Sequence, residues 1–462
     1  MIHPYIYQTR VAVSMLLLTV GLTNCKLYKD PPSTEQIAES ALPPNTLIPD
    51  HWTADATTTQ DVSEDWYREF DDERLNGYIT EALDSANPGV VYRLARIRAS
   101  ESGVQLARAG RAVYMDYGAG YAGSYTSDNG YSQNAGVGLA ISWEADLWGK
   151  IAAGIEAAQE NVVAETHQLA YTRMSIAADV SASYFTIGAQ YDLLDLGYEF
   201  IALNQDIIEI LKKRESVGII DQKEVYMAQA KLNEINSIVK NTENTLQESI
   251  RQLEVILGRY PAKNLEVSWR PDDLHGEVQL SDPYSLLSRR PDVRALEHQV
   301  RQVFYLREQA ELAKYPSLTL TLTPGLSTAD GLFITPVASL LGPILNGKSI
   351  RAQVEQLDAQ QQQLVANYGS LVLQAYNEVE TSLNAAQLLA ERLAFAKEAA
   401  EDYKNVYQIA LDQYSVGRID LFDVLLMQSQ YLSAELDVVN LKLMNYLVRI
   451  QLYLSLGGAL TN

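Results

Sequence analysis

Apolar residues recur with a helical period over unusually long stretches of this chain. Residues 150–214 contain no proline and few glycines, so one nearly continuous helix of roughly 65 residues, about 95 Å long, is expected there. Farther along, apolar residues step by three and four through 232–256 and again through 432–453. Because heptad spacing is the signature of coiled coils, these stretches predict long helices packed side by side. Alanine also repeats at every seventh position, which allows close helix approach, at Ala352, Ala359 and Ala366.

Two shorter stretches alternate apolar with small or polar residues, which is the period of a strand. The first lies on either side of a turn at 127–130, and the second on either side of a turn at 328–331. They predict two strand hairpins, at about 113–145 and about 315–343. Residues that share one face are Tyr117, Ala119, Tyr121, Gly123 and Tyr125, then Val137, Leu139, Ile141 and Trp143; in the second hairpin Leu318, Leu320 and Leu322 alternate with Thr319, Thr321 and Thr323.

These predicted strands raise the question of a membrane. Strands of about ten residues with one apolar face and one small or polar face are typical of outer-membrane barrels, in which one face meets lipid and the other a wet lumen. The edge of a soluble sandwich is the alternative. Four strands are too few to close a barrel, and an open edge in hydrocarbon leaves unpaired backbone groups that cost several kcal/mol each. If the strands cross a membrane, several chains must therefore share one barrel.

Three short motifs occur twice, in the same order. Residues 87–90 are echoed by 290–293, residues 147–150 by 345–348, and Ser-Val-Gly-x-Ile-Asp at 216–221 by the same motif at 415–420. Recurrence at a nearly constant offset predicts a tandem duplication. The expected division is a first structural repeat at 71–255, a connector at 256–285, a second structural repeat at 286–456 and a C-terminal tail at 457–462.

Each Ser-Val-Gly-x-Ile-Asp motif falls at the break between two predicted long helices. Gly218 and Gly417 can adopt positive φ and end a helix without a Cβ penalty. Asp221 and Asp420 can cap the next helix by accepting hydrogen bonds from its first free N–H groups. Helix punctuation alone explains these residues, and a further role at the tips is the alternative.

The N-terminus has the pattern of an export signal. Arg10 precedes an apolar run at 11–22 that is too short to span a bilayer but has the length of a signal h-region. The run ends near Cys25, the only cysteine of the chain, in a context that resembles a bacterial lipoprotein lipobox. We therefore expect a signal peptide at 1–24 and a lipidated N-terminal segment at 25–70, with a covalent lipid on Cys25. An ordinary cleaved signal is the alternative, and no later stretch is apolar for long enough to be a transmembrane helix.

Charge and composition narrow the function classes. The chain has 36 Lys and Arg against 58 Asp and Glu, a formal net charge of −22. Repulsion therefore argues against binding to nucleic acid or to an anionic lipid surface, and a cationic partner or an acidic lumen fits better. The five histidines are scattered, and no metal-ligand spacing or catalytic motif occurs. We expect neither an enzyme nor a bound cofactor.

One motif competes with that interpretation. Residues 342–349 match G-x-x-x-x-G-K-[ST], the phosphate-binding loop. The context is poor, because there is no run of βαβ units and no hydrophobic strand ending in an Asp for magnesium. The duplicate of this motif keeps Gly149 and Lys150 but has Glu144 in place of the first glycine. A strand-to-helix junction shared by both repeats explains the motif better than a nucleotide site.

Six segments occur in an order that points to one protein family. They are WYREFDDERLNGYITEAL (66–83), SWEADLWGKI (142–151), LLSRRPDVRALE (286–297), KYPSLTL (314–320), PILNGKSIRAQV (343–354) and YSVGRIDLFDVLLMQ (414–428). Together with Cys25, they resemble the TolC-type outer membrane factors, in particular the lipoprotein branch of the efflux channels. The resemblance implies an α + β membrane protein, a homotrimer in which each chain gives four strands to one 12-stranded outer-membrane β-barrel that continues into a long periplasmic α-helical coiled-coil barrel. It also places the segments 25–70 and 256–285 around an equatorial region.

The same resemblance implies location, partners and function. The chain is expected in the bacterial outer membrane, lipid-anchored and in contact with outer-membrane lipid, and to bind a periplasmic adaptor protein and an inner-membrane efflux pump. Its expected function is a passive exit duct for substrates that the pump delivers. The alternatives are the outer-membrane channel of a type I protein or peptide secretion system, or a non-conducting lipoprotein coiled-coil scaffold, which has no use for lipid-facing strands. The transported substrate is not apparent from the sequence.

The resemblance also implies roles at the two tips. Adaptor docking at the periplasmic entrance is expected for Val217, Gly218, Asp221, Val416, Gly417 and Asp420. Asp423 would form a ring of three carboxylates around the pore axis, and Leu426 an apolar constriction beside it. Tyr414 and Arg418 would tie neighbouring hairpins by hydrogen bonds or ion pairs. The alternative is that Arg418 is a solvated tip charge and Asp423 a first-turn acid that favours the helix dipole.

Overall fold

The computed structural model describes residues 27–53, 65–127, 130–270, 272–274, 280, 282–344 and 347–458. The predicted signal peptide at 1–24 and the predicted lipidation site Cys25 lie outside these residues. The chain divides into two compact units. Unit 1 consists of Met1–Thr46, Leu94–His167 and Val293–Leu371, and unit 2 of Leu47–Arg93, Gln168–Asp292 and Val372–Asn462. Each unit combines segments from both halves of the sequence, so the compact units and the predicted repeats divide the chain differently.

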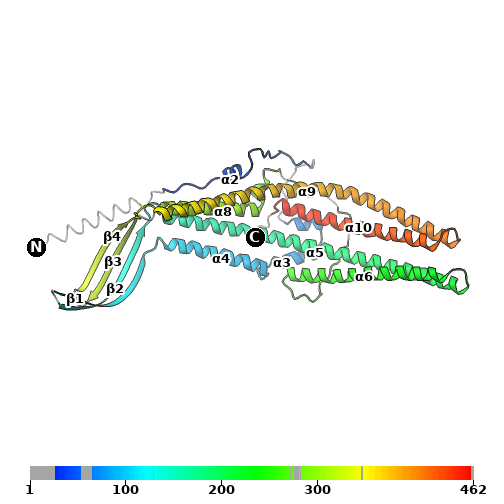
Figure 1. Cartoon of the computed structure of the whole chain (residues 1–462), viewed down its shortest axis with the longest axis horizontal. Helices are drawn as coiled ribbons and strands as arrows, with labels where there is room; N and C mark the ends of the chain where they lie inside the picture. Colours follow the sequence, from blue (N-terminus) through cyan, green and yellow to red (C-terminus); the bar gives the residue numbers. More distant parts are fainter. Residues whose placement is uncertain are drawn as a thin grey trace. The chain divides into compact units, whose positions relative to one another are not determined.

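Four strands of unit 1 form an antiparallel sheet in the order β1-β2-β3-β4 (Figure 1). They are β1 (Tyr114–Thr126), β2 (Gly130–Ala145), β3 (Ser317–Ser327) and β4 (Gly331–Leu341), and both predicted hairpins are therefore present. The β2–β3 pairing, in which Ile141 lies opposite Leu322, joins segments that are far apart in the sequence. Within the described part of the chain, β1 and β4 are edge strands with one side unpaired.

The strand register gives this sheet two chemically different faces, because residues directly opposite each other project to the same side. On the first face Val137 pairs with Leu326, which pairs in turn with Leu332. The same face carries Tyr117, Leu139, Ile141, Trp143, Leu318, Leu320, Leu322 and Leu340. The second face holds mainly small and polar residues, among them Gly118, Gly138, Gly325, Thr319, Thr321 and Thr323. Leu332 is 79% exposed, so much of the apolar face is left uncovered by the described residues.

The helices of unit 1 follow the same lateral order as the strands. Along the chain α4 (Pro88–Ala109) leads into β1, β2 into α5 (Lys150–Ser216), α8 (Pro291–Leu312) into β3, and β4 into α9 (Gly347–Ser415). The contacts that set the order are Arg96 with Glu165 between α4 and α5, His298 with Glu160 at 2.6 Å between α8 and α5, and Arg307 with Asp358 at 2.6 Å between α8 and α9. The helix order α4-α5-α8-α9 therefore matches the strand order (Figure 1).

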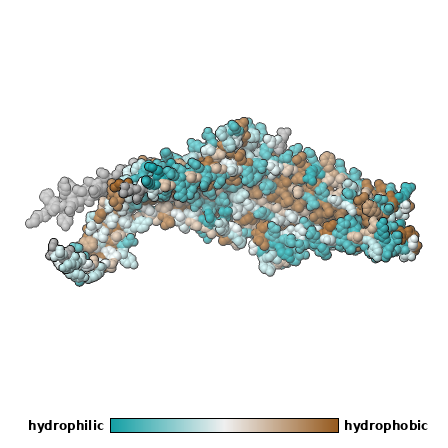
Figure 2. All heavy atoms as spheres, in the orientation of Figure 1, coloured by the Kyte–Doolittle hydropathy of each residue, from teal (hydrophilic) through white to brown (hydrophobic). Residues whose placement is uncertain are grey.

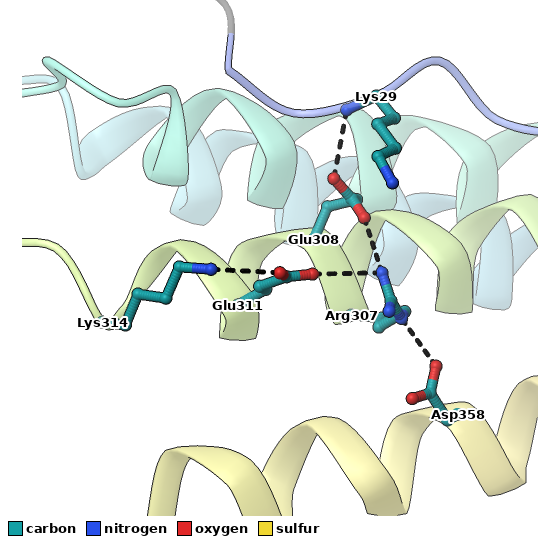
Figure 3. A network of polar contacts seen from close by, with 6 residues as sticks. All are labelled: Lys29, Arg307, Glu308, Glu311, Lys314 and Asp358. Carbon is teal, nitrogen blue, oxygen red and sulfur yellow. Dashed lines mark hydrogen bonds and ion pairs between the residues drawn. The ribbon is translucent and has the colours of Figure 1, made fainter. Parts of the chain in front are cut away.

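The first described residues of the chain are attached to α8 by polar contacts (Figure 3). The backbone N–H of Lys29 donates to a carboxylate oxygen of Glu308 at 3.1 Å. Glu308 also accepts from Arg307 at 2.8 Å, and Arg307 donates in turn to Asp358 of α9. The aromatic ring of Tyr28 lies edge-on to that of Tyr305 on α8. The position of the chain a few residues after Cys25 is thus fixed within unit 1.

Unit 2 is built from long helices around aromatic-rich cores. Besides parts of α5 and α9 it contains η1 (Trp66–Phe70), α3 (Glu73–Ala82), α6 (Gln222–Ile256), α7 (Leu286–Arg289) and α10 (Leu421–Ser455), while the short helix α2 (Thr34–Ala41) belongs to unit 1. In the larger core the rings of Phe185 and Tyr446 lie 4.6 Å apart, centroid to centroid. A second core joins α5, α6, α9 and α10 through Phe200, Leu211, Val225, Tyr407, Leu421 and Val424.

The helix predictions agree with the structure in length and in buried face. The stretch predicted at 150–214 is α5, which has 67 residues and therefore a length of about 100 Å. The predicted α6 seam is buried at Ile235, Val239, Leu246 and Leu253. The alanines at 352, 359 and 366 of α9 are exposed within the chain. No helix among the described residues is both long enough and apolar enough to cross a membrane.

A buried ion cluster lies in unit 2 where residues 290–292 meet α9 and α10. The side chain of Arg290, which is 4% exposed, contacts both carboxylate oxygens of Asp292, at 2.7 and 3.1 Å. Its Nη1 also donates to Glu378 of α9 at 2.7 Å and to the carbonyl oxygen of Ser455 at the end of α10 at 3.3 Å. Because a charge buried without partners is very unfavourable, these contacts must form together.

Candidate functional site at the helical hairpin tips

Both Ser-Val-Gly-x-Ile-Asp motifs form the turn between two long helices. Gly218 and Gly417 have φ values of 74° and 75°, as predicted for glycines that end a helix in the left-handed region. The N–H groups of Gly218 and Ile219 donate back to Glu215 and Arg214, and the α9–α10 turn repeats this pattern. The two tips are thus the same backbone structure made twice, with one glycine required at each.

The prediction that Asp221 and Asp420 cap the following helices with their side chains is wrong. Asp221 and Asp420 do occupy the N-cap positions of α6 and α10, with extended backbones, but neither carboxylate forms a capping hydrogen bond. Both side chains are exposed, so water can solvate the carboxylates and the free helix N–H groups separately. What remains is the favourable interaction of a negative charge with the positive end of the helix dipole.

The Tyr414 side chain joins the two helical hairpins of one chain. Its hydroxyl, on α9, donates to a carboxylate oxygen of Glu224 on α6 at 2.8 Å. The guanidinium of Arg214 on α5 lies over the Tyr414 ring, 5.2 Å from its centroid, and donates to the Ser415 carbonyl oxygen at 3.2 Å. Burial and the Glu224 carboxylate raise the pKa of Tyr414 to about 12, so the hydroxyl stays protonated and remains a donor at neutral pH. These residues form a tether, which we define as Arg214, Glu224 and Tyr414.

Sequence reasoning selected Tyr414 but missed its partners. The offset that relates Gly218 to Gly417 also relates Glu224 to Asp423. Extending the alignment of the two motifs by a few residues would have identified Glu224 as the counterpart of the predicted gate residue Asp423. Arg214 has no such signal, because Gln413 stands at the equivalent position.

The other predicted gate residues do not join the tether. Arg418 is exposed, and its guanidinium makes no hydrogen bond or ion pair with the residues that the structure describes. Asp423 is exposed in the first turn of α10, and Leu426 is 41% exposed one turn later. They begin a continuous exposed stripe on α10, which consists of Asp423, Leu426, Gln430, Ser433, Asp437, Asn440 and Met444. This stripe is mostly polar, as expected of a surface that faces water.

Apolar side chains project from both tips. Val217 and Val416 are 68% and 69% exposed, and Ile219 is exposed to the same degree. Ile220 and Ile419, by contrast, pack against the core between the hairpins. The duplicated motif therefore anchors each turn with one isoleucine and presents a valine outward. Each tip thus leaves apolar side chains uncovered within the described chain, and Figure 2 shows hydrophobic residues on the surface at this end of the hairpins.

A shallow groove runs between α9 and α10 farther from the tips. It has a volume of about 460 Å³, and the residues that line it are Ala396, Ala399, Tyr403, Gln430, Ser433, Ala434, Leu436, Asp437 and Asn440. Small side chains on both helices leave room for another chain to approach closely. The groove shares four residues with the α10 stripe, so the two surfaces are continuous.

The described residues give no support to a nucleotide or metal site. No group of His, Cys, Asp and Glu among them could hold a metal ion. Gly342 of the phosphate-loop match follows β4, an antiparallel edge strand, whereas phosphate-binding loops follow the strand of a βαβ unit. Residues 345 and 346 of that motif lie outside the described chain.

Known proteins resemble the chain over nearly its full length. Residues 80–259 and 283–458 match the family described as outer membrane efflux protein. The pyoverdine export outer membrane protein OpmQ of Pseudomonas aeruginosa is 27% identical over 433 residues, which cover 89% of this chain and 91% of OpmQ. The probable outer membrane lipoprotein SilC of Salmonella typhimurium is 22% identical over 463 residues, 97% of this chain and 98% of SilC. Among solved structures, the Campylobacter jejuni CmeC outer membrane channel has the same fold, with a TM-score of 0.83 at 20% identity over 95% of this chain and 96% of CmeC.

Proposed function

The chain belongs to the outer membrane efflux protein family and is a TolC-type outer membrane factor. From this membership we propose that it serves as the outer-membrane exit duct of a tripartite efflux system. In this role it passively conducts substrates that an inner-membrane pump delivers through a periplasmic adaptor. In this role the energy for transport comes from the pump.

The two-faced sheet is the observation that carries this proposal. Its apolar face suits lipid and its small, polar face suits a water-filled lumen. Strands β3 and β4 have eleven residues each, so tilted by about 40° they cover about 28 Å along the membrane normal, close to the apolar band of outer-membrane barrels. Pairing the free edge of β4 with the free edge of β1 in another copy removes both edges. We propose that three copies close a 12-stranded barrel in this way, with the helices of the three chains forming a periplasmic tunnel.

We assign the tips to docking and closure. The exposed Val217 and Val416, on turns built by Gly218, Asp221, Gly417 and Asp420, form the proposed adaptor-docking surface. In the trimer the exposed stripe of α10 lines the lumen, so Asp423 forms a carboxylate ring and Leu426 an apolar one. Arg418, exposed on its own chain, is placed to bind an acidic group of the neighbouring chain.

We propose that Cys25 carries a lipid, and the attachment of the residues that follow it limits how far that lipid can lie from unit 1. Lys29 is held at Glu308, and four residues span at most about 14 Å, so a lipid on Cys25 must lie close to the end of α8. Tyr28 lies against Gly149, where an added Cβ would be 2.9 Å from the tyrosine ring. Gly149 directly precedes α5 at the junction with β2. A lipid anchored there would enter the membrane beside the proposed barrel.

Single-channel recording tests the proposed function. The purified full-length protein in a planar lipid bilayer should give discrete conductance steps. Complete absence of conductance, with trimers verified in the same bilayers, would contradict the duct and favour a non-conducting scaffold.

A further inference from the structure

Two of the chain's five histidines lie together where α5 packs against α8 in unit 1. The imidazole rings of His167 and His298 stack with centroids 5.4 Å apart and an angle of 16° between their planes. His298 is 8% exposed, and its Nδ1 lies 2.6 Å from Glu160 on α5. Its Nε2 is buried without a hydrogen-bond partner among the described residues. His298 is therefore shielded from water, whereas His167 is half-buried. One ring nitrogen of His298 is left unsatisfied among the described residues.

The acidic groups near the pair are already engaged. Glu160 on α5 contacts His298. Glu297 on α8 is fully buried, accepts a hydrogen bond from the Thr34 hydroxyl at 2.6 Å, and forms ion pairs with Arg301 at 2.5 Å and Arg294 at 3.6 Å. The charged groups that face the pair are thus Glu160 from α5 and Arg294, Glu297 and Arg301 from α8, while the N-terminal segment contributes the uncharged Thr34.

This environment disfavours a proton on His167. Burial is the largest influence, and His298 and Arg294 add to it; together they lower the pKa of His167, while Glu297 opposes them only in part. Two stacked imidazoles also cannot both become cations without repelling each other.

We propose that the His167–His298 pair is an acid-sensitive joint between α5 and α8. With His167 neutral, the stacked rings hold the two helices together, and proton uptake by His167 loosens the contact. Because the pKa of His167 is lowered in the packed state, the opened state binds the proton more tightly. The packed state is fully favoured above the ordinary histidine pKa of about 6.5 and loses stability as the pH falls below that value.

The joint connects the two halves of the sequence. Helix α5 follows β2 and α8 leads into β3, so loosening this contact separates the helices that support the β2–β3 pairing. All contacts of the joint lie within one chain, so its response to acid does not depend on whether the chain conducts.

Titration of the histidine ring signals in the full-length wild-type protein is the first test. We would label histidine with ¹³C, embed the protein in lipid nanodiscs and assign the signals from five single variants, His3→Gln, His51→Gln, His167→Gln, His275→Gln and His298→Gln. The joint requires the His167 signal to titrate below the ordinary histidine value of about 6.5. A midpoint at or above that value would overturn the proposal. This readout remains decisive if the His167 variant fails to fold, because the other four variants assign its signal by exclusion.

Hydrogen–deuterium exchange is the second test. On acidification from about pH 7.5 to about pH 5.5, which spans the histidine range, peptides from 155–167 of α5 and 293–304 of α8 should exchange severalfold faster, after correction for the intrinsic pH dependence. His167→Gln should remove this acid response, whereas His51→Gln, at an exposed position, should keep it. An equal acid response in His167→Gln and wild type would contradict the joint.

Discussion

The Tyr414 hydroxyl links two helical hairpins whose contacting residues are 190 positions apart in the sequence. Because its pKa is raised to about 12, the hydroxyl donates to Glu224 throughout the physiological pH range. The contact is therefore a hydrogen bond to a charged acceptor and needs no proton change to persist. Such a bond is lost only when the pH rises through the tyrosine pKa, since the folded state favours the protonated phenol.

Breaking the tether should relax the tips. Tyr414→Phe removes the donor, and the loss of one half-exposed hydrogen bond to a charged group is worth about 1 kcal/mol. We expect a higher resting single-channel conductance in Tyr414→Phe, and a further increase in the double variant with Arg214→Ser. Tyr260→Phe is the matched control, because Tyr260 is 84% exposed and far from the tips in sequence. Unchanged conductance in both tether variants would limit the duplicated motif to ending helices.

At this scale the sequence allowed some predictions and not others. The positive φ of Gly218 and Gly417 follows from local backbone sterics alone, so the motif was sufficient. Capping by Asp221 and Asp420 was predicted from residue preference, but water competes for exposed carboxylates and the bonds do not form. The pairing of Tyr414 with Glu224 depends on how two hairpins pack, which no local pattern encodes.

At the scale of helices and strands, periodicity determined most of the outcome. Alternation in β3 placed leucines on one face and threonines on the other, and the register shows the same division. Helix length followed from the lack of proline between 150 and 214. The lateral order α4-α5-α8-α9 did not follow from periodicity, because it depends on contacts such as Arg307 with Asp358 that join distant segments.

The Arg290 cluster should be the most sensitive polar contact of unit 2. Arg290→Ala leaves Asp292 and Glu378 without their partner and frees the Ser455 carbonyl, so we expect the free energy of unfolding to fall by about 3 to 5 kcal/mol. Guanidinium-induced unfolding in detergent measures this. Arg392→Ala, which removes an exposed arginine of the same unit, should change the free energy by less than about 0.5 kcal/mol. Similar values for the two variants would show that the cluster adds nothing beyond surface charge.

At the scale of the whole molecule, the net charge should govern which ions pass through the proposed lumen. The net charge of −22 must be carried mostly on solvated surfaces, and the α10 stripe presents Asp423 and Asp437. A narrow aqueous path with one sign of charge concentrates counter-ions. We therefore expect the reversal potential in a salt gradient to show cation selectivity; a preference for anions would contradict it.

The Asp423 ring gives a sharper version of that expectation. If three carboxylates face one axis, Asp423→Ala should weaken block by trivalent cations added from the periplasmic side. Asp420→Ala is the matched control, since it removes an exposed acid at the turn rather than on the stripe. Equal block in wild type and Asp423→Ala would place Asp423 away from the pore.

The lipid proposed on Cys25 can be removed by mutation without preventing insertion of the protein into the membrane. Cys25→Ser should abolish labelling by a palmitate analogue, while trimers should still insert, because a closed barrel holds the protein in the membrane more strongly than an acyl chain does. Cys25 is the only cysteine, so no other thiol can take the label. Labelling that persists in Cys25→Ser would rule out this anchor.

The β2–β3 pairing also bears on ancestry. It joins the two halves of one chain by the same kind of edge contact that β4 and β1 would make between chains. The described residues that connect β2 with β3 lie outside the sheet. If the halves descend from one gene, a ring of half-length subunits could have closed by the same pairings before the genes fused. Fusion would then have allowed equivalent positions to diverge. Glu224 and Asp423 are equivalent in the two motifs, yet Glu224 accepts a hydrogen bond from Tyr414 and Asp423 is exposed. Gene fusion would thus have given an originally uniform ring two kinds of tip. In one, the acid at this position binds the neighbouring hairpin; in the other, it is free to interact with the transported substrate.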